Sequence, residues 1–229
     1  IGDLADSLFE MTEALWSRMD AIENFAADVA HEIKNPLTSL RSAVETVARV
    51  QDPDQQRKLM TIIQEDVIRL DRLLTDISDA SRLDAELSRA VMKPVNISPI
   101  LSTLVDAYRI SDDPDAPNVR MEEIDDLMVS GIESRLAQVF RNMIGNAISF
   151  SPANSDIIVS AVKNGTTVEM TVADQGPGIP EGKEADIFNR FYTERPESEK
   201  FGSHSGLGLS ISRQIIETHE GEMFAENCR

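Results

Sequence analysis

The chain has 229 residues, of which 41% are hydrophobic and 27% charged, a composition typical of folded globular domains. This length allows one large domain or two smaller ones with proper cores. The formal net charge is −18, from 22 basic and 40 acidic side chains, which argues against nonspecific binding to nucleic acid or to an anionic membrane. A polyphosphate ligand would need a cation and a local cluster of donors.

The remaining bounds concern the chain's cysteine content, its apolar runs and its first residue. A single cysteine, Cys228, excludes an internal disulfide. No apolar run reaches about 18 residues and no signal peptide is evident, so we predict no membrane span. Because the chain starts at Ile1 inside a helical pattern, we expect it to be part of a longer protein. We expect no nucleic-acid partner and no direct membrane contact for this part.

The first third of the chain is predicted to form two long amphipathic helices. Apolar residues recur every three or four positions across 4–47 and again across 60–77, the spacing of a bundle seam. Residues 51–54 break the pattern, with Asp52 as a cap and Pro53 in the first turn of the second helix. One hairpin cannot bury the apolar faces of both helices, so we expect two copies to pair as a dimeric four-helix bundle. The alternative is a monomeric hairpin that folds onto the next domain.

The stretch 25–37 in the first helix carries a candidate reactive group. At about 100° per residue, His31 is rotated roughly 200° from the apolar residues two positions to either side, so it should point into solvent. Glu32 places a carboxylate beside it, and Asn35 lies one turn further along the same face. Pro36 removes a backbone donor and should bend or loosen the helix there. Taken alone, the stretch fits a surface histidine without a role equally well.

The rest of the chain is predicted to be a mixed sheet with helices stacked on one face. Strands are expected near 95–97, 119–124, 127–132, 157–162 and 167–173, of which the last two flank the hairpin signal at 164–165. Helices are expected from a Ser98 cap to about 108, from about 133 to 150, and from about 207 to 219. Residues 223–227 are expected to begin a further strand that is cut short after residue 227.

Three segments of this second part offer groups that can bind a ligand. Asn142 and Asn146 share a helix face, where amide oxygens can ligate a hydrated divalent ion. The segment 174–178, Asp-Gln-Gly-Pro-Gly, offers a carboxylate for an exocyclic amine and glycines that let a ligand approach the backbone. The segment 205–209 opens a helix whose N-terminal amides suit phosphate. Each pattern alone fits a solvated surface, a tight turn or an ordinary helix start.

Together and in this order, the segments resemble the Asn box, the first glycine box, the Phe box and the second glycine box of sensor histidine kinases. The Phe box is 187–192, and Ala-Asp-Val-Ala-His-Glu-Ile-Lys-Asn-Pro-Leu at 27–37 resembles the family's phosphoacceptor box. Residues 1–11 resemble the end of a HAMP linker, which relays signals from a membrane-anchored part. The runs 71–83 and 205–212 resemble one alphaproteobacterial branch of the family.

The resemblance implies an α+β chain in three parts. Residues 1–20 would end a signalling helix, 21–90 would form the dimerisation and phosphotransfer hairpin, and 91–229 would form an α/β-sandwich (Bergerat-type) ATP-binding domain with a truncated last strand. The chain would be the cytoplasmic portion of an inner-membrane sensor. Its partners would be a second copy and a response-regulator receiver domain.

The resemblance also implies a role for each residue of the phosphoacceptor box. His31 would take the γ-phosphate of ATP as a phosphoramide, because an ordinary imidazole is largely neutral at pH 7 and keeps a nucleophilic nitrogen. Glu32 would accept from the other ring nitrogen and fix the tautomer. Asn35 would orient a water when the kinase dephosphorylates its partner.

For the nucleotide, the resemblance implies ATP and Mg²⁺ as cofactors. Asn146 would ligate Mg²⁺, Asp174 would read the adenine amine, and Arg190 would lie nearest the γ-phosphate, with Arg195 as a weaker candidate. Residues 194–205 would form a lid over ATP. The other residues expected at the nucleotide are Asn142, Phe150, Gly176, Gly178, Ser205, Gly206, Leu207 and Gly208.

Some positions depart from the family's usual pattern. Gly145 stands where an acidic residue is common, and Ser149 and Phe150 stand where lysine and tyrosine are common. His204 replaces a usual glycine before the second glycine box, and Glu220 replaces a glycine near the end. These changes put the rate in doubt more than the reaction.

The leading interpretation is an active protein-histidine kinase core with additional phosphatase activity. One alternative is a degenerate kinase that acts as a scaffold or phosphatase without ATP. Another is an ATPase of the same fold, although such an enzyme has no use for the helical module around His31. A zinc enzyme is excluded in practice, since the His-Glu-x-x-Asn motif lacks the second histidine of a zinc-binding helix.

Overall fold

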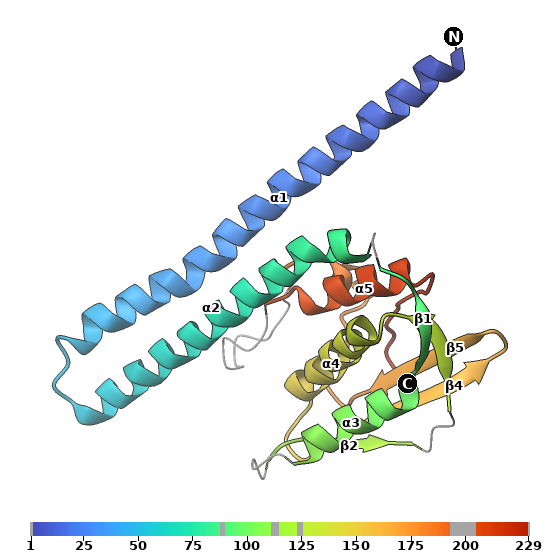
Figure 1. Ribbon diagram of the computed structural model, residues 1–229. Coiled ribbons are helices and arrows are strands. Elements are labelled where there is room, and N and C mark those ends of the chain that lie inside the picture. The colour runs from blue at the N-terminus through green and yellow to red at the C-terminus, as the bar shows by residue number, and fades with distance from the viewer. Residues whose placement is uncertain (1, 88–89, 111–114, 123–125, 193–204, 229) are drawn as a thin grey trace. The chain divides into compact units, whose positions relative to one another are not determined.

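The computed structural model describes residues 2–87, 90–110, 115–122, 126–192 and 205–228. The chain divides into two compact units, and the division falls after residue 77, within a helix. Figure 1 shows the helices and strands of both units and labels most of them. None of the helices in the described ranges is long and apolar enough to cross a membrane.

The first unit is a helical hairpin, as predicted. Helix α1 (Gly2–Val47) continues through Pro36 without interruption, and α2 (Pro53–Leu87) starts at the predicted proline. The Asp52 carboxylate accepts a hydrogen bond from Asp54 N at 3.0 Å, which confirms Asp52 as the cap of α2. The local sequence therefore determines where the second helix begins.

The hairpin leaves much of its apolar seam exposed. Leu8, Met11, Leu15 and Met19 of α1 are each at least 45% exposed, and α2 shows the same pattern. Other large apolar side chains exposed in this unit are Phe9, Trp16, Ile22, Leu37, Val44, Met60, Ile62, Val67, Ile68 and Leu74. Burying such a surface contributes about 25 cal/mol per Å², so one hairpin leaves a large part of this stabilisation unused.

The second unit begins with the last turns of α2 and continues as a mixed α+β domain. Its strands are β1 (Lys93–Asn96), β2 (Asn118–Met121), β3 (Met128–Gly131), β4 (Asp156–Asn164) and β5 (Thr167–Ala173). Its helices are α3 (Ile97–Arg109), α4 (Glu133–Phe150), a short 3-10 turn η1 (Asp186–Phe188) and α5 (Gly208–Thr218). Strand β1 pairs antiparallel with β3, while β4 pairs parallel with β2 and antiparallel with β5. Helix α4 packs on β4 and β5 and is flanked by α3 and α5 (Figure 1).

The core of this unit lies between the helices and the sheet. Apolar side chains at helical spacing on α3, α4 and α5 meet the alternating inward residues of β4. Together with Val119 of β2 and Leu207 just before α5, the core side chains with almost no exposed surface are Leu101, Val105, Val139, Ile144, Ile157, Val159 and Ile215. Each such burial contributes about 1.5–3 kcal/mol.

Two sequence predictions at element ends are wrong. Helix α3 is capped by Asn96, which accepts from Ser98 N at 3.1 Å, whereas the predicted cap Ser98 lies inside the helix and accepts from Leu127 N at 3.3 Å. Residues 223–227 form no strand, and the hydrogen bonds described for Asn227 come from its side chain and not from a backbone ladder.

The end of α5 is tied to the start of α4 by His219. Its Nδ1 lies 2.7 Å from Ile215 O, and its Nε2 accepts from Ile132 N at 3.0 Å. This pair of contacts requires the neutral tautomer with the proton on Nδ1. A Cβ on Gly131 would lie only 2.9 Å from the ring, so glycine is needed there. The contact helps to fix α5 against α4, the two helices that carry the candidate site.

Candidate nucleotide and phosphoacceptor sites

His31 projects from α1 with an exposed side chain, and Asn35 is exposed one turn later. Glu32 has a different environment, because its Oε2 lies 3.3 Å from Arg69 Nη2 on α2. The Arg69 side chain is 18% exposed and the Glu32 side chain 21%, so the ion pair is largely shielded from water. No contact described for the hairpin joins Glu32 to His31. Glu32 therefore links the two helices through one carboxylate oxygen.

In the second unit, Asn142 connects α4 to the start of α5. Its amide nitrogen donates to Gly208 O at 3.1 Å and to Ser212 Oγ at 3.2 Å. Because a carbonyl can only accept, the Asn142 nitrogen must face Gly208. The amide oxygen of Asn142 is then left without a partner among the described residues. Asn142 positions the second glycine box and keeps an acceptor for a ligand.

Asn146 lies one turn further along α4 and is half-buried. Its side chain makes no hydrogen bond to any residue in the described ranges, so nothing there competes with a ligand. The described residues contain no group of three or more His, Cys, Asp or Glu side chains that could hold a metal ion. Mg²⁺ bound together with phosphates keeps several waters and needs only one or two protein oxygens. An amide pair on α4 is thus compatible with Mg²⁺.

The loop after β5, residues 174–179, holds the first glycine box. Asp174 Oδ1 accepts from Gly176 N at 2.8 Å, which folds the loop back on itself. A Cβ on Gly176 would lie 2.8 Å from this oxygen and 2.9 Å from Phe150 O, so no larger residue fits without a shift. The loop therefore passes close to the end of α4, and the second carboxylate oxygen of Asp174 remains available to a ligand.

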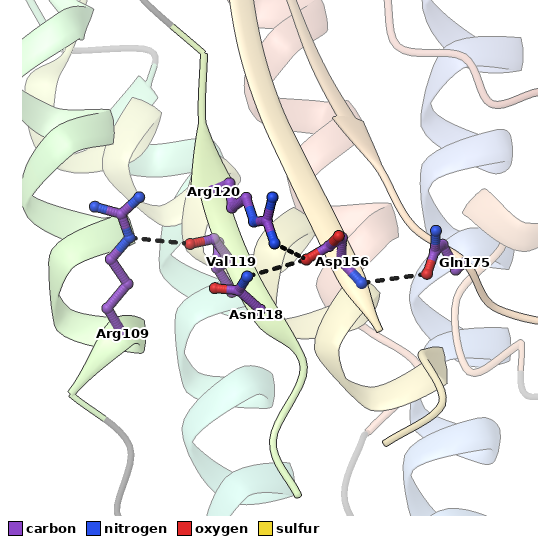
Figure 2. A network of polar contacts seen from close by, with 6 residues as sticks. All are labelled: Arg109, Asn118, Val119, Arg120, Asp156 and Gln175. Carbon is purple, nitrogen blue, oxygen red and sulfur yellow. Dashed lines mark hydrogen bonds and ion pairs between the residues drawn. The ribbon is translucent and has the colours of Figure 1, made fainter. Parts of the chain in front are cut away.

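Gln175, which the sequence analysis did not single out, ties this loop to β4. Its Oε1 accepts from Asp156 N at 3.2 Å, and the Asp156 carboxylate in turn receives Asn118 Nδ2 at 3.0 Å and Arg120 Nη2 at 2.9 Å. Figure 2 shows this network, which also includes the bond from Arg109 Nε to Val119 O at 3.2 Å. The network joins the glycine loop to the β2–β4 edge of the sheet.

The Phe box and the second glycine box meet through their backbones. Phe191 N donates to Gly206 O at 2.9 Å. Phe191 has φ 59°, a left-handed conformation that is uncommon for a bulky residue, and Gly206 has φ 71°. Phe188 is buried and lies 5.4 Å from the Arg213 guanidinium carbon, which stacks over its ring. The Phe box is thus held on α5.

The start of α5 offers backbone donors. Ser205 is buried and its Oγ accepts from Leu207 N at 3.2 Å, while Leu207 is fully buried. No side chain caps the first turn that begins at Gly208, so its amides are left for a ligand. This geometry matches what a phosphate requires.

The two arginines expected near the γ-phosphate lie in or after the Phe box. Arg190 is exposed on the Phe box. Arg195 and residues 194–204 of the expected lid lie outside the described residues.

Gly145 lies beside a tyrosine of α3. A Cβ there would lie 3.8 Å from the Tyr108 hydroxyl, an ordinary contact, so an alanine fits. Burial raises the pKa of Tyr108, although Arg141 acts in the opposite direction. The phenol therefore stays protonated at neutral pH.

We expect Gly176→Ala to weaken nucleotide binding about tenfold, since overpacking against backbone costs about 1–3 kcal/mol. The added Cβ would push Asp174 and the Phe150 carbonyl apart. Titration calorimetry with ADP and Mg²⁺ measures this effect. Gly145→Ala is the matched control, because its Cβ meets only ordinary contacts. Equal affinity in the Gly176→Ala variant would show that the loop does not touch the nucleotide.

Two protein-family models match the chain. The His Kinase A (phospho-acceptor) domain matches residues 21–86, and the histidine kinase-, DNA gyrase B-, and HSP90-like ATPase domain matches residues 131–228. Together they cover both His31 and the nucleotide boxes. The second match makes residues 131–228 an ATP-binding domain of this type.

Curated relatives and solved structures agree with these matches. The sensor protein ChvG of Rhizobium meliloti (strain 1021) is 50% identical over 241 residues, which cover 99% of this chain and 41% of that protein. ChvG of Agrobacterium fabrum is 49% identical, and the match covers 99% of this chain and 39% of that protein. The chain thus spans about two fifths of the length of these relatives.

Among solved structures, that of histidine kinase ThkA in complex with response regulator protein TrrA matches with a TM-score of 0.72 and 26% identity. The match covers 93% of this chain and 60% of that one. The nucleotide-free catalytic domain of ThkA matches with a TM-score of 0.51 and 27% identity, over 61% of this chain and 90% of that one. With both domains matched, in the order that the motifs indicated, this chain belongs to the sensor histidine kinases and is of the ChvG type.

Proposed function

We propose that the chain is the kinase core of a sensor protein, which phosphorylates His31 with ATP and passes the phosphoryl group to an aspartate of a response regulator. Two observations support this proposal: His31 is exposed in one unit, and the other unit carries the segments expected at a nucleotide. There Asn142 is bonded to the start of α5, and the 174–179 loop passes Phe150 at the end of the same helix, α4. A plain ATPase has no use for the first unit.

The nucleotide site supplies binding and orientation. Asn146, and the free oxygen of Asn142, would hold Mg²⁺, which neutralises charge on the β- and γ-phosphates when bound. The free oxygen of Asp174 would accept from the adenine amine, and Phe150 would stack on the base. The amides at the start of α5 would receive the phosphates, with Arg190 near the γ-phosphate. Gly176 would let the loop pass close to Phe150, and Gly178 and Gly206 would supply the positive φ that the two glycine boxes need around the ligand.

The transfer itself uses a ring nitrogen of His31. This nitrogen forms the new N–P bond while the bond from the β,γ-bridging oxygen to the γ-phosphorus breaks, and ADP leaves with the electron pair. Glu32 would accept from the other ring nitrogen and stabilise the positive imidazole that forms. Since Arg69 engages Oε2 of Glu32, the second oxygen is the one available for this contact. Asn35 would orient a water in the reverse, dephosphorylating direction.

The exposed seam of the hairpin favours a homodimer. A second copy would bury the apolar stripes of α1 and α2 in a four-helix bundle. In this proposal residues 1–20 end a HAMP-like signalling helix, 21–90 form the dimerisation and phosphotransfer hairpin, and 91–229 form the ATP-binding domain. The whole would be the cytoplasmic part of an inner-membrane sensor.

One labelling experiment tests the function. Incubated with Mg²⁺ and γ-labelled ATP, the chain is expected to gain an acid-labile, base-stable label that moves to a receiver domain. α-Labelled ATP and a reaction with EDTA should leave the protein unlabelled. ATP hydrolysis without labelled protein would favour an ATPase of the same fold. If the chain gains no label and also binds no nucleotide, it is a degenerate kinase that serves as a scaffold or phosphatase.

A further inference from the structure

The 174–179 loop is held at its far end by a side chain from the last described residues of the chain. Asn227 Nδ2 donates to Ile179 O at 2.7 Å, and Asn227 Oδ1 accepts from Ile179 N at 2.8 Å. Both bonds have near-optimal lengths. One primary amide thus satisfies both backbone groups of Ile179, as a neighbouring strand would do.

The same amide packs against Gly178. A Cβ on Gly178 would lie 2.7 Å from Asn227 Oδ1, and Gly178 has φ 79°, a region that other residues rarely adopt. Gly178 is therefore required for two reasons, its backbone conformation and the close approach of Asn227. The second reason can be removed by mutation while the first remains.

At its near end the loop is also held by polar contacts. Gln175 accepts from Asp156 N, and Asp174 accepts from Gly176 N. Most side chains of the loop are exposed, so apolar packing contributes little to its position. Removing the Asn227 amide should leave the far end of the loop without a fixed conformation, although the fold beneath it stays intact.

We propose that Asn227 is a positioning residue for the nucleotide, which acts by fixing the backbone of the loop that lines the base. The inference rests on the proposed function. Without this amide the loop must be ordered when the nucleotide binds, and the lost conformational entropy weakens affinity. A residue near the end of the sequence, outside every motif noted above, thus sets the affinity of the site.

The test uses the full 229-residue chain and three variants. Asn227→Ala removes both hydrogen bonds, while Asn227→Asp keeps the acceptor but places a charged oxygen against the Ile179 carbonyl. Each is expected to bind ADP with Mg²⁺ about tenfold more weakly at 25 °C, as expected for the loss of such bonds. Glu226→Gln, an exposed neighbour on the same segment, is expected to bind like the unaltered chain. Thermal unfolding without nucleotide should differ little among the variants.

A double-mutant cycle and hydrogen exchange complete the test. Gly178→Ala should weaken binding less in the Asn227→Ala background than alone, because the clash with Oδ1 is gone. The Ile179 amide should exchange faster in Asn227→Ala without nucleotide. Affinity within twofold of the unaltered chain in both Asn227 variants would overturn the inference, as would lower thermal stability with unchanged affinity.

The two proposals fail in different ways. If the unaltered chain binds no ADP, the proposed function and the role of Asn227 in affinity both fall. If the unaltered chain binds ADP and the variants bind equally, the inference alone is overturned. Unchanged exchange of the Ile179 amide in Asn227→Ala would overturn it in either case.

Discussion

His31→Gln is expected to abolish the acid-labile label, with labelling reduced by more than about 10³-fold, as for loss of a catalytic nucleophile. Glutamine retains polarity and comparable length, but its amide nitrogen has no lone pair available for attack on phosphorus. Because His31 is exposed and has no described partner, its replacement should leave the hairpin stable. Binding of ADP with Mg²⁺, measured by calorimetry, should be unchanged.

A label that survives His31→Gln would show that another residue is the phosphoacceptor. Mixing this variant with Asn146→Ala provides a further readout in the proposed dimer. Recovery of the label in mixed dimers would mean that one copy phosphorylates the other. No recovery, although mixed dimers form, would mean that each chain phosphorylates its own histidine.

Asn146→Ala is expected to reduce labelling by more than about 100-fold through loss of a Mg²⁺ ligand. The fold should be little affected, because this side chain has no hydrogen bond to the described residues. Thermal unfolding without nucleotide should therefore resemble that of the unaltered chain, while the stabilisation that ADP with Mg²⁺ normally adds should disappear.

Asn142→Ala is the matched comparison. Its amide bonds Gly208 and Ser212, so its loss should lower stability even without nucleotide, by about 1–3 kcal/mol. If Asn146→Ala also lowers stability in the absence of nucleotide, then Asn146 has a structural role and its assignment to Mg²⁺ is wrong. If Asn146→Ala labels normally, the ion is held elsewhere.

Elements with strong local patterns were predictable from the sequence. Helix α4 has the predicted bounds, since its apolar spacing runs unbroken from Glu133 to Phe150. The β4–β5 hairpin follows from Asn164-Gly165, and Gly165 has the positive φ of 63° that such a turn needs. The cap of α3 was misplaced, because Asn96 and Ser98 are both good capping residues two positions apart.

The strand expected at 223–227 illustrates a different limit. A strand needs a partner, and local composition does not reveal whether one is available. The side chain of Asn227 instead bonds a residue distant in sequence. The same limit applies to Glu32, whose ion pair with Arg69 joins residues on two helices.

For the candidate site, the sequence motifs predict which segments take part but not the hydrogen bonds that position these segments. Asn142 was expected at the nucleotide, yet its two donors bond the start of α5. Gln175 lies inside the first glycine box, a motif that is recognised by its aspartate and its glycines and not by the residue between them. Asn227 carries no signal in the sequence, because its role depends on the tertiary fold alone.

The bond from Phe191 N to Gly206 O joins the two ends of the intervening segment at its base. A segment closed in this way can differ in length between relatives while its attachment points stay the same. The entropy of closing a loop grows only logarithmically, by about 0.6 kcal/mol for each doubling of length. The bond therefore keeps the Phe box beside the second glycine box at an entropic cost that depends only weakly on the length of chain between them.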